Sequence, residues 1–238
     1  MINKLKNLLK RSPIALNQNH RYDILTKKII NNLDPDSNGI DVGCYKGEIL
    51  DLILKAAPQG RHFGIEPVPA QYEILREKYK NLKNCTILNF AASNVSGSSD
   101  FNYVISNPAY SGLVKRDYDR AHEKDQSIRV KTELLDQLID PGLRIDLIKI
   151  DVEGAELRVL EGASEIISRW RPLVIFEHGL GASEHYGTTP NMVYDYFEER
   201  KMKISNLKRY LKGKGSLSKE EFEKQYYEKE NYYFIAHA

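Results

Sequence analysis

Short apolar runs alternate with segments of helical periodicity along most of this chain, which restricts its possible folds more than any other feature. We predict strands at residues 40–43, 61–66, 85–92, 145–150 and 172–177, and helices at 20–33, 48–57, 69–80, 154–169 and 190–201. Elements that alternate in this way form βαβ units, whose parallel sheet is covered by helices on both faces. The sequence therefore predicts an α/β fold with ligand-binding residues at the carboxyl edge of the sheet.

The length of 238 residues suits one α/β domain with additions, and no linker divides the chain. Hydrophobic residues make up 41% and charged residues 29%, so wholesale disorder is excluded. We predict a single domain over residues 1–238 with an N-terminal helical extension at 1–38, a hairpin and flap insertion at 93–127, and a basic, Tyr-rich C-terminal segment at 203–238. In that last segment, Ser218 and Glu221 predict a capping box, and NYYFIA near the end predicts a strand.

Charge, hydropathy and cysteine content exclude several classes of protein. The 35 Lys and Arg residues nearly balance the 33 Asp and Glu residues, giving a net charge of +2, so we expect no nucleic-acid partner bound through bulk charge. No apolar run approaches the roughly 18 residues of a membrane span, and the first residues lack the unbroken apolar stretch of a secretion signal. Cys44 and Cys85 form no CxxC motif, so we expect reduced thiols and a cytoplasmic protein.

A glycine-containing turn follows the first predicted strand of the alternating region. Gly43 and Gly47 lie four residues apart, which does not match the G-x-G-x-x-G fingerprint and so disfavours an NAD(P)-dependent oxidoreductase. The glycines allow a ligand to approach the backbone, and Asp41 adds a carboxylate that suits a cationic or hydroxylated ligand. An ordinary strand-to-helix turn is the alternative. We expect the cofactor-binding residues of this turn to be Asp41, Gly43, Cys44, Tyr45 and Gly47.

Glu66 ends the second strand of this region, 66 − 47 = 19 residues after the last glycine of the turn. In nucleoside-binding α/β folds an acidic residue at this place accepts hydrogen bonds from the ribose hydroxyls, although a surface Glu before Pro67 is the simpler alternative. The turn and Glu66 together indicate a nucleoside ligand without a phosphate group in the turn, and S-adenosylmethionine fits this description. We expect its adenine to lie near Asn89, Ala91 and Ala92.

The segment DLIKIDVEGAELRVLEGA, residues 146–163, carries the most specific motif of the chain. It strongly resembles the FkbM family of methyltransferases, and the resemblance extends over about residues 38–178. It implies a Rossmann-like class I methyltransferase fold, with a mostly parallel sheet, helices on both faces and an antiparallel C-terminal strand. It also implies an S-adenosylmethionine-dependent O-methyltransferase that acts on a hydroxyl of a small-molecule acceptor, in particular a sugar or glycan. A non-catalytic cofactor-binding or scaffold protein of the same fold is the alternative.

Titratable residues cluster at the carboxyl ends of the fourth and fifth strands. We expect Asp151 to contact the methionine end of the cofactor or the acceptor hydroxyl, with Glu153 beside it in the first turn of the next helix. His178 titrates closest to neutral pH and is therefore predicted to accept the proton of that hydroxyl, although a solvated loop histidine is at least as common. A metal held by Asp151 with Glu177 or His178 is the alternative, but no second Asp accompanies Glu177, so we expect no metal.

Two further segments bear on the acceptor. Residues 105–127 are polar and unusually long for a loop, so we expect them to form a mobile flap over the acceptor. The basic stretch at residues 208–214 is compatible with an anionic glycan or nucleic-acid acceptor, but a solvated charged surface is the favoured interpretation.

Overall fold

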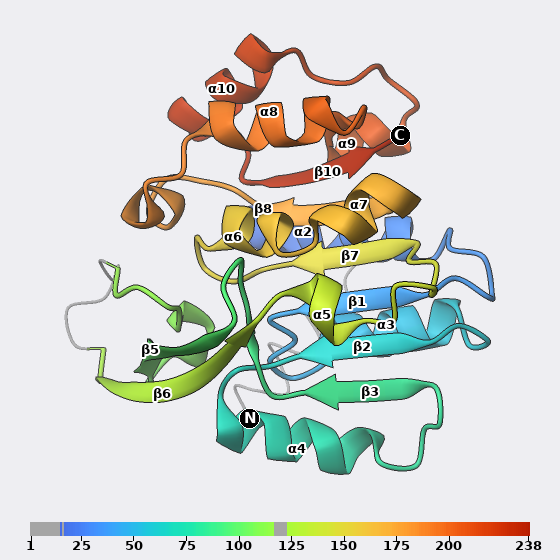
Figure 1. The fold of residues 1–238 in the computed structure, drawn as a ribbon. Coiled ribbons are helices and arrows are strands. Elements are labelled where there is room, and N and C mark those ends of the chain that lie inside the picture. The colour runs from blue at the N-terminus through green and yellow to red at the C-terminus, as the bar shows by residue number, and fades with distance from the viewer. Residues whose placement is uncertain (1–14, 16, 117–122) are drawn as a thin grey trace.

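The computed structural model describes residue 15 and residues 17–116 and 123–238 of the chain, and its main feature is a sheet in the order β3-β2-β1-β7-β8-β10-β9 (Figure 1). Its strands are β1 (Gly39–Val42), β2 (His62–Ile65), β3 (Cys85–Leu88), β7 (Leu147–Ile150), β8 (Leu173–Glu177), β9 (Lys203–Asn206) and β10 (Tyr233–His237). The pairs from β3 to β8 are parallel, whereas β10 runs antiparallel to both β8 and β9. The predicted α/β fold with an antiparallel C-terminal strand is confirmed.

Helices cover both faces of this sheet (Figure 1). They are α2 (Gln18–Ile30), α3 (Glu48–Ala56), α4 (Pro69–Tyr79), α5 (Leu135–Leu138), α6 (Glu156–Glu161), α7 (Ser164–Trp170), α8 (Pro190–Glu199), α9 (Leu207–Leu211) and α10 (Lys219–Tyr227). Alternate residues of each strand point to opposite faces, so Phe176 joins the core under α6, α7, α8 and α10, while its neighbour Ile175 joins the core under α2 and α9. This alternation decides which strand-end residues can reach the site.

The helix predicted at residues 154–169 is divided into α6 and α7. A Cβ at Gly162, between the two, would lie 2.0 Å from the carbonyl oxygen of Ser93, so only glycine permits this approach of the two chain segments. The carboxylate of Asp136 then accepts hydrogen bonds from two backbone N–H groups in the first turn of α7, which satisfies donors that a new helix start leaves unpaired. The predicted strand at 85–92 is likewise divided, because its last residues leave the main sheet.

A second, smaller sheet has the order β4-β6-β5 and stands at the carboxyl edge of the main sheet (Figure 1). It consists of β4 (Ala91–Ala92), β5 (Gly97–Val104) and β6 (Asp125–Glu133), of which β5 and β6 form an antiparallel hairpin. The connection between them contains the short 3-10 helix η1 (Pro108–Tyr110). The flap predicted at 105–127 therefore contains the start of β6, and its residues 117–122 lie outside the described part of the chain.

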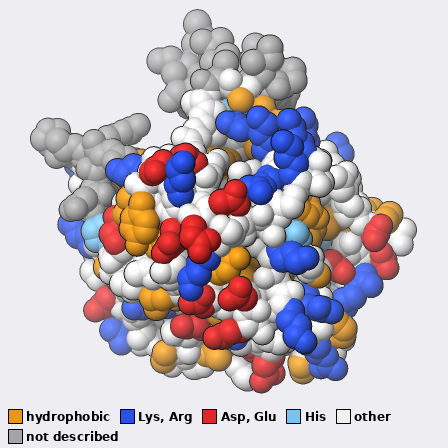
Figure 2. Space-filling model, turned by 90° about the horizontal axis from the view of Figure 1, so that it is seen from above, with side chains coloured by type: hydrophobic (Ala, Val, Ile, Leu, Met, Phe, Trp, Pro, Cys, Tyr) orange, Lys and Arg blue, Asp and Glu red, His pale blue; other side chains and the backbone are white. Residues whose placement is uncertain are grey.

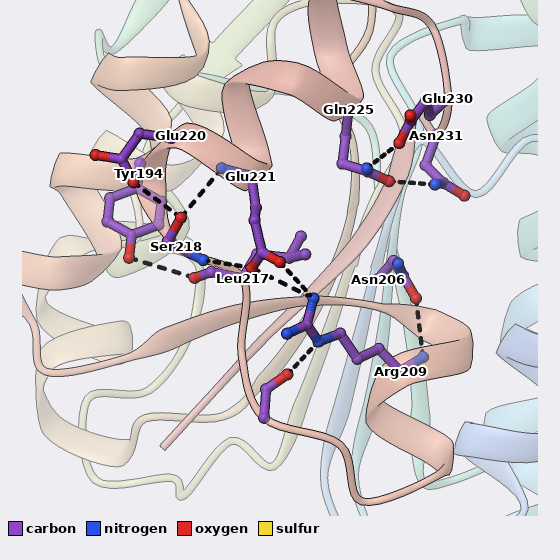
Figure 3. A network of polar contacts seen from close by, with 11 residues as sticks. Tyr194, Asn206, Arg209, Leu217, Ser218, Glu220, Glu221, Gln225, Glu230 and Asn231 are labelled. Carbon is purple, nitrogen blue, oxygen red and sulfur yellow. Dashed lines mark hydrogen bonds and ion pairs between the residues drawn. The ribbon is translucent and has the colours of Figure 1, made fainter.

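The start of α2 contacts the turn before β10 beside the carboxyl edge. The capping box predicted at Ser218 and Glu221 starts α10 (Figure 3). At the other end of that helix, the Gln225 side chain hydrogen-bonds both Glu230 and Asn231 and so fixes the turn that leads into β10 (Figure 3). Asn231 in turn accepts a hydrogen bond from the hydroxyl of Tyr22 in α2.

Basic and acidic side chains both spread over the face shown in Figure 2, as the nearly balanced charge predicts. Among the described residues, no helix has the length and apolar character needed to cross a membrane.

The core makes a direct stability prediction. Phe176 is fully buried, with its ring centroid 5.3 Å from that of Phe197 and 6.0 Å from that of Phe234. Phe176→Ala should lower the free energy of unfolding by about 3–5 kcal/mol, because it removes buried apolar surface and leaves a cavity. Urea denaturation followed by circular dichroism measures this change. Val95→Ala, at a position that is 63% exposed, should stay within about 0.5 kcal/mol of the parent protein.

Candidate active site

Three cavities open at the carboxyl edge of the main sheet, and we name each after an acidic residue that lines that cavity and neither of the other two. The Glu66 cavity, the Asp41 cavity and the Glu177 cavity have volumes of about 150, 230 and 630 Å³. Among the described residues, Asp151 is the only one that lines all three. A ligand with parts in all three cavities would therefore have to pass the Asp151 side chain.

The turn after β1 brings the backbone against the end of β7. Gly43 has a φ of +77°, and a Cβ there would lie 2.0 Å from the carbonyl oxygen of Asp151. Gly47 also has a positive φ, +73°, and a Cβ there would lie 2.2 Å from the hydroxyl of Tyr79. Only glycine fits at either place, and the result is an open floor of backbone between the Glu66 and Asp41 cavities. Gly47 itself lines neither cavity, so the structure gives it the role of shaping the turn.

Glu66 lies at the end of β2 and is 5% exposed. Its two carboxylate oxygens accept hydrogen bonds from the backbone N–H groups of Tyr45 (2.9 Å) and Val68 (3.0 Å). Burial raises the pKa of Glu66 to about 7, despite these two donors. Each carboxylate oxygen has a second lone pair, so Glu66 retains acceptor capacity for hydroxyl groups of a ligand.

The other residues predicted to surround the nucleoside have different positions. Ala91 and Ala92 line the Glu66 cavity together with Phe90. The structure does not bring Asn89 into the cavity lining: its side-chain amide donates to the carbonyl oxygens of Glu66 and Pro67. Asn89 therefore stabilises the backbone at Glu66 and Pro67 and does not line the cavity.

Asp41 lies in β1 at the base of the Asp41 cavity and is 1% exposed. Neither of its carboxylate oxygens makes a hydrogen bond of normal geometry within the described protein. Burial raises the pKa of Asp41 to about 6, although the Lys149 ammonium opposes this rise. Cys44 and Tyr45 line the same cavity. An unpaired buried carboxylate is costly, so this cavity suits a ligand that brings a cation or hydrogen-bond donors to Asp41.

A cluster of carboxylates surrounds the point where the cavities meet. Oxygens of Asp151, Glu153 and Glu177 lie within 4.8 Å of one another, a spacing at which they could also bind a metal ion. Burial would raise the pKa of Asp151, but the Lys149 ammonium, 2.8 Å from its Oδ2 atom, and the Tyr233 hydroxyl hold this pKa below the ordinary value. Burial and the charge of Asp151 raise the pKa of Glu177 well above its usual range.

Glu153 has a basic partner within the cluster. Arg116 forms an ion pair with it at 2.5 Å and lies over the ring of Tyr110, 4.5 Å from the centroid. Even so, burial and the charge of Asp151 raise the pKa of Glu153 to about 8. Because Glu177 has no such cationic partner among the described residues, it is the carboxylate best placed to act on a ligand in the Glu177 cavity.

The DVEGAE segment holds this loop in place through Glu156. The Oε1 atom of Glu156 accepts hydrogen bonds from the backbone N–H groups of Val152 and Gly154, both at 3.1 Å. Glu153 has a φ of +58°, and Gly154 has a φ of +107° with the carbonyl oxygen of Ala182 2.5 Å from where a Cβ would lie. The close spacing of acidic residues and glycine in the motif thus serves the loop geometry that presents Asp151 and Glu153 to the cavities.

The structure does not bring His178 to the cavities. Its side chain is 1% exposed and stacks against the rings of Phe222 and Tyr226, with centroid distances of 5.8 and 4.7 Å. Burial lowers the pKa of His178 to about 4, and neither ring nitrogen has a hydrogen-bond partner in the described protein. A general base must reach the hydroxyl it deprotonates, so this position does not suit the proton-accepting role predicted for His178.

Sequence reasoning did not assign a role to three residues of the site. Lys149 could have been found, because it lies in β7 two positions before Asp151, which directly follows the strand, and so shares its side of the sheet. Tyr233 from β10 and Arg116 from the connection after β5 carry no such local signal, since only the tertiary fold brings them to Asp151 and Glu153.

Asp41 provides a pH-dependent stability prediction. Its pKa in the folded protein lies above the unfolded value of 3.8, so its carboxylate destabilises the fold fully above about pH 6 and progressively less as the pH falls toward 3.8. Asp41→Asn should therefore raise the free energy of unfolding by roughly 1–3 kcal/mol at pH 8 and by clearly less at pH 4.5. Urea denaturation at the two pH values tests this, with the exposed Asp100→Asn as control. A gain that is equal at both pH values would contradict it.

Comparison with known proteins shows which family the chain matches. The methyltransferase sdnD of Sordaria araneosa is 27% identical, over 64% of this chain and 71% of that protein. The 2-O-methyltransferase NoeI of Sinorhizobium fredii (strain NBRC 101917 / NGR234) is 29% identical, over 61% of this chain and 65% of that protein, which is less than two thirds of its length. The crystal structure of methyltransferase FkbM from Methylobacillus flagellatus KT has the same fold, with a TM-score of 0.53 and 15% identity over 87% of this chain and 44% of that chain.

The family described as "Methyltransferase FkbM domain" matches residues 41–204, which is well over half of the chain. The matched region contains the glycine turn, Glu66 and the DVEGAE segment. The resemblance predicted from these motifs is confirmed, and an oxidoreductase is excluded. The chain belongs to the FkbM family of methyltransferases, and its cofactor is S-adenosylmethionine.

Proposed function

We propose that this methyltransferase transfers the methyl group to a hydroxyl of a small molecule, in particular a sugar or glycan. The observation that carries the proposal is that Asp151 lines all three cavities. When bound, S-adenosylmethionine supplies a methyl group on a positively charged sulfur that joins a nucleoside to an amino-acid tail. A nucleoside in the Glu66 cavity and a tail in the Asp41 cavity would leave the methyl group near Asp151, facing the Glu177 cavity.

The residues of the first two cavities suit these two parts. Glu66 would accept the ribose hydroxyls, and Phe90, Ala91 and Ala92 would provide an apolar surface for adenine. In the other cavity, the unpaired carboxylate of Asp41 would receive the ammonium group of the tail. Both assignments pair a ligand group with an acceptor that the protein alone leaves unsatisfied or only partly satisfied.

The Glu177 cavity suits a hydroxylated acceptor. Tyrosine rings line it together with the side-chain amides of α2 and the turn before β10; these residues are Tyr110, Tyr226, Tyr232, Tyr233, Gln18, Asn19 and Asn231. Aromatic faces offer flat apolar contacts to the CH faces of a sugar, while amides and carboxylates hydrogen-bond its hydroxyls. Its volume of about 630 Å³ lies in the range typical of small-molecule sites. The name of the relative NoeI, a 2-O-methyltransferase, adds support for transfer to oxygen.

The carboxylate cluster provides the proton acceptor that the reaction needs. A hydroxyl loses its proton as its oxygen takes the methyl group, and a positioned base accelerates such a step by about 10²–10⁴-fold. Glu177 faces the acceptor cavity, and Asp151 beside it is held ionised by Lys149 and Tyr233. We therefore assign the proton acceptor to Glu177, acting together with Asp151.

The cofactor assignment is tested by Glu66→Ala. Loss of a charged hydrogen-bond acceptor costs about 1.5–3 kcal/mol, so the dissociation constant of S-adenosylhomocysteine should rise by roughly 10- to 100-fold. Isothermal titration calorimetry gives this constant directly. Glu73→Ala on the exposed side of α4 should bind like the parent protein. A dissociation constant that Glu66→Ala leaves unchanged would show that the ribose lies elsewhere.

The reaction is tested with S-adenosylmethionine carrying a radiolabelled methyl group and a panel of methyl glycosides. We expect label in an alkali-stable methyl ether of at least one glycoside. Glu177→Gln should lower turnover by about 10²–10⁴-fold, because it removes the base. The adjacent His178→Phe, which keeps the stacked ring, should retain most of the activity.

Three results would revise the assignment. Cofactor binding without label transfer to any glycoside favours the non-catalytic alternative or another acceptor class. Loss of activity in His178→Phe but not in Glu177→Gln would reverse the choice of base. Activity that disappears in EDTA and returns with Mg²⁺ would assign Asp151, Glu153 and Glu177 to a metal ion instead.

A further inference from the structure

We infer that Tyr233 is a positioning residue that fixes the carboxylate of Asp151 so that the site favours a cationic ligand group over a neutral one; this inference rests on the proposed function. Tyr233 begins β10 and stands opposite Glu177 in the antiparallel pair with β8. Its hydroxyl donates a hydrogen bond of 2.5 Å to the Oδ2 atom of Asp151. Tyr233 also lines both the Asp41 and the Glu177 cavity, so it stands at their boundary.

The geometry of the two donors fixes the orientation of the carboxylate. Lys149 and Tyr233 both donate to Oδ2, at 2.8 and 2.5 Å, and approach from different strands of the sheet. Because both donors bind Oδ2, they restrict rotation of the carboxylate, and Oδ1 accepts a hydrogen bond from neither of them. Because Asp151 is then ionised and already oriented, a cation at the junction of the cavities gains attraction without first reorganising the protein.

Tyr233 is itself held by α2. The ring of Tyr22 stacks on that of Tyr233, with centroids 5.1 Å apart and an interplanar angle of 30°. The Tyr22 hydroxyl accepts hydrogen bonds from Gln18 (2.8 Å) and from the backbone N–H of Tyr232 (3.2 Å), and donates one to Asn231 (3.1 Å). Tyr22 thus ties the start of β10 to α2 at the residue before Tyr233.

These supporting residues lie outside the region that the family match covers. The match spans residues 41–204, whereas Tyr22 precedes it and Tyr233 follows it. The DVEGAE segment places the backbone of Asp151, whereas Tyr233, supported by Tyr22, sets the direction of its side chain together with Lys149. A role for the Tyr-rich C-terminal segment follows, although its sequence alone indicates none.

The test compares two cofactor analogues that differ in charge at one position. S-adenosylhomocysteine has a neutral thioether sulfur, whereas sinefungin has a C–NH₃⁺ group where the cofactor has its S⁺–CH₃ group. Isothermal titration calorimetry should show that the parent protein binds sinefungin more tightly than S-adenosylhomocysteine. In Tyr233→Phe this preference should fall by about 5- to 20-fold while the affinity for S-adenosylhomocysteine changes less than about threefold.

Matched variants separate positioning from a general structural effect. Tyr22→Phe should shift the preference in the same direction by a smaller factor. Tyr194→Phe should not shift it, because the Tyr194 hydroxyl donates to the carbonyl oxygen of Leu217, away from Asp151. A preference for sinefungin that survives in Tyr233→Phe would overturn the inference. Equal losses of affinity for both analogues would overturn it as well, because they indicate damage to the whole cavity. If Tyr233→Phe melts at a lower temperature than the parent protein, Tyr22→Phe provides the test instead. A stably folded Tyr22→Phe that keeps the full preference for sinefungin would then overturn the inference.

The binding measurements test the role of Tyr233 independently of the proposed acceptor. Both analogues bind without an acceptor, so a protein that methylates none of the glycosides can still show the predicted shift. Where a glycoside is methylated, Tyr233→Phe should lower kcat with little change in the KM for the glycoside. A rise in that KM with kcat unchanged would instead place Tyr233 in acceptor binding and overturn the positioning role.

Discussion

The buried ammonium of Lys149 is the constraint on which the arrangement of the site depends. Lys149 is 5% exposed and lies in β7, in register with Asp41 of the neighbouring β1. A charge at such a position needs partners, and it finds one directly in Asp151 and a second, more distant one in Asp41. Burial would lower the pKa of Lys149, but these two carboxylates outweigh that effect and raise it. One lysine thereby holds acidic residues of two neighbouring strands at one edge of the sheet.

The charges around Asp151 are not balanced by the protein alone. Fully ionised, the carboxylates of Asp151, Glu153 and Glu177 would outnumber the cations of Lys149 and Arg116 by one. The raised pKa values of Glu153 and Glu177 are the response of the protein to this excess, because retaining a proton is less costly than burying another charge. A sulfonium cation would supply the missing positive charge. When methyl transfer removes that charge, a proton left on Glu177 would restore the balance.

The sequence predicts six of the seven strands of the main sheet, because short apolar runs and glycine turns are local patterns, but it does not predict β9 (Lys203–Asn206). The error in placing His178 came from treating two consecutive strand-end residues as one cluster. Residues alternate across a sheet, so Glu177 faces the side of Ile175 and His178 the side of Phe176, toward α10. This signal was available in the sequence. The positions of Tyr233 and Arg116 were not, because they depend on how the C-terminal strand and the connection after β5 fold back onto the sheet.

The residues of the site form two groups, which are held in place by different parts of the fold. Glu66, Gly43 and Glu156 are fixed mainly by backbone hydrogen bonds and close backbone contacts within the region of the family match, so this part of the site is determined by its own strands and turns. The wall of the Glu177 cavity instead combines α2, η1 and the start of β10, which are far apart in the chain. Substitutions at Gln18, Tyr110 or Tyr232, which line the Glu177 cavity and neither of the other two, can reshape this cavity without disturbing the backbone floor between the Glu66 and Asp41 cavities. Under the proposed function, one methyl-transfer centre can therefore serve different acceptors, provided that Tyr233 still donates its hydrogen bond to Asp151.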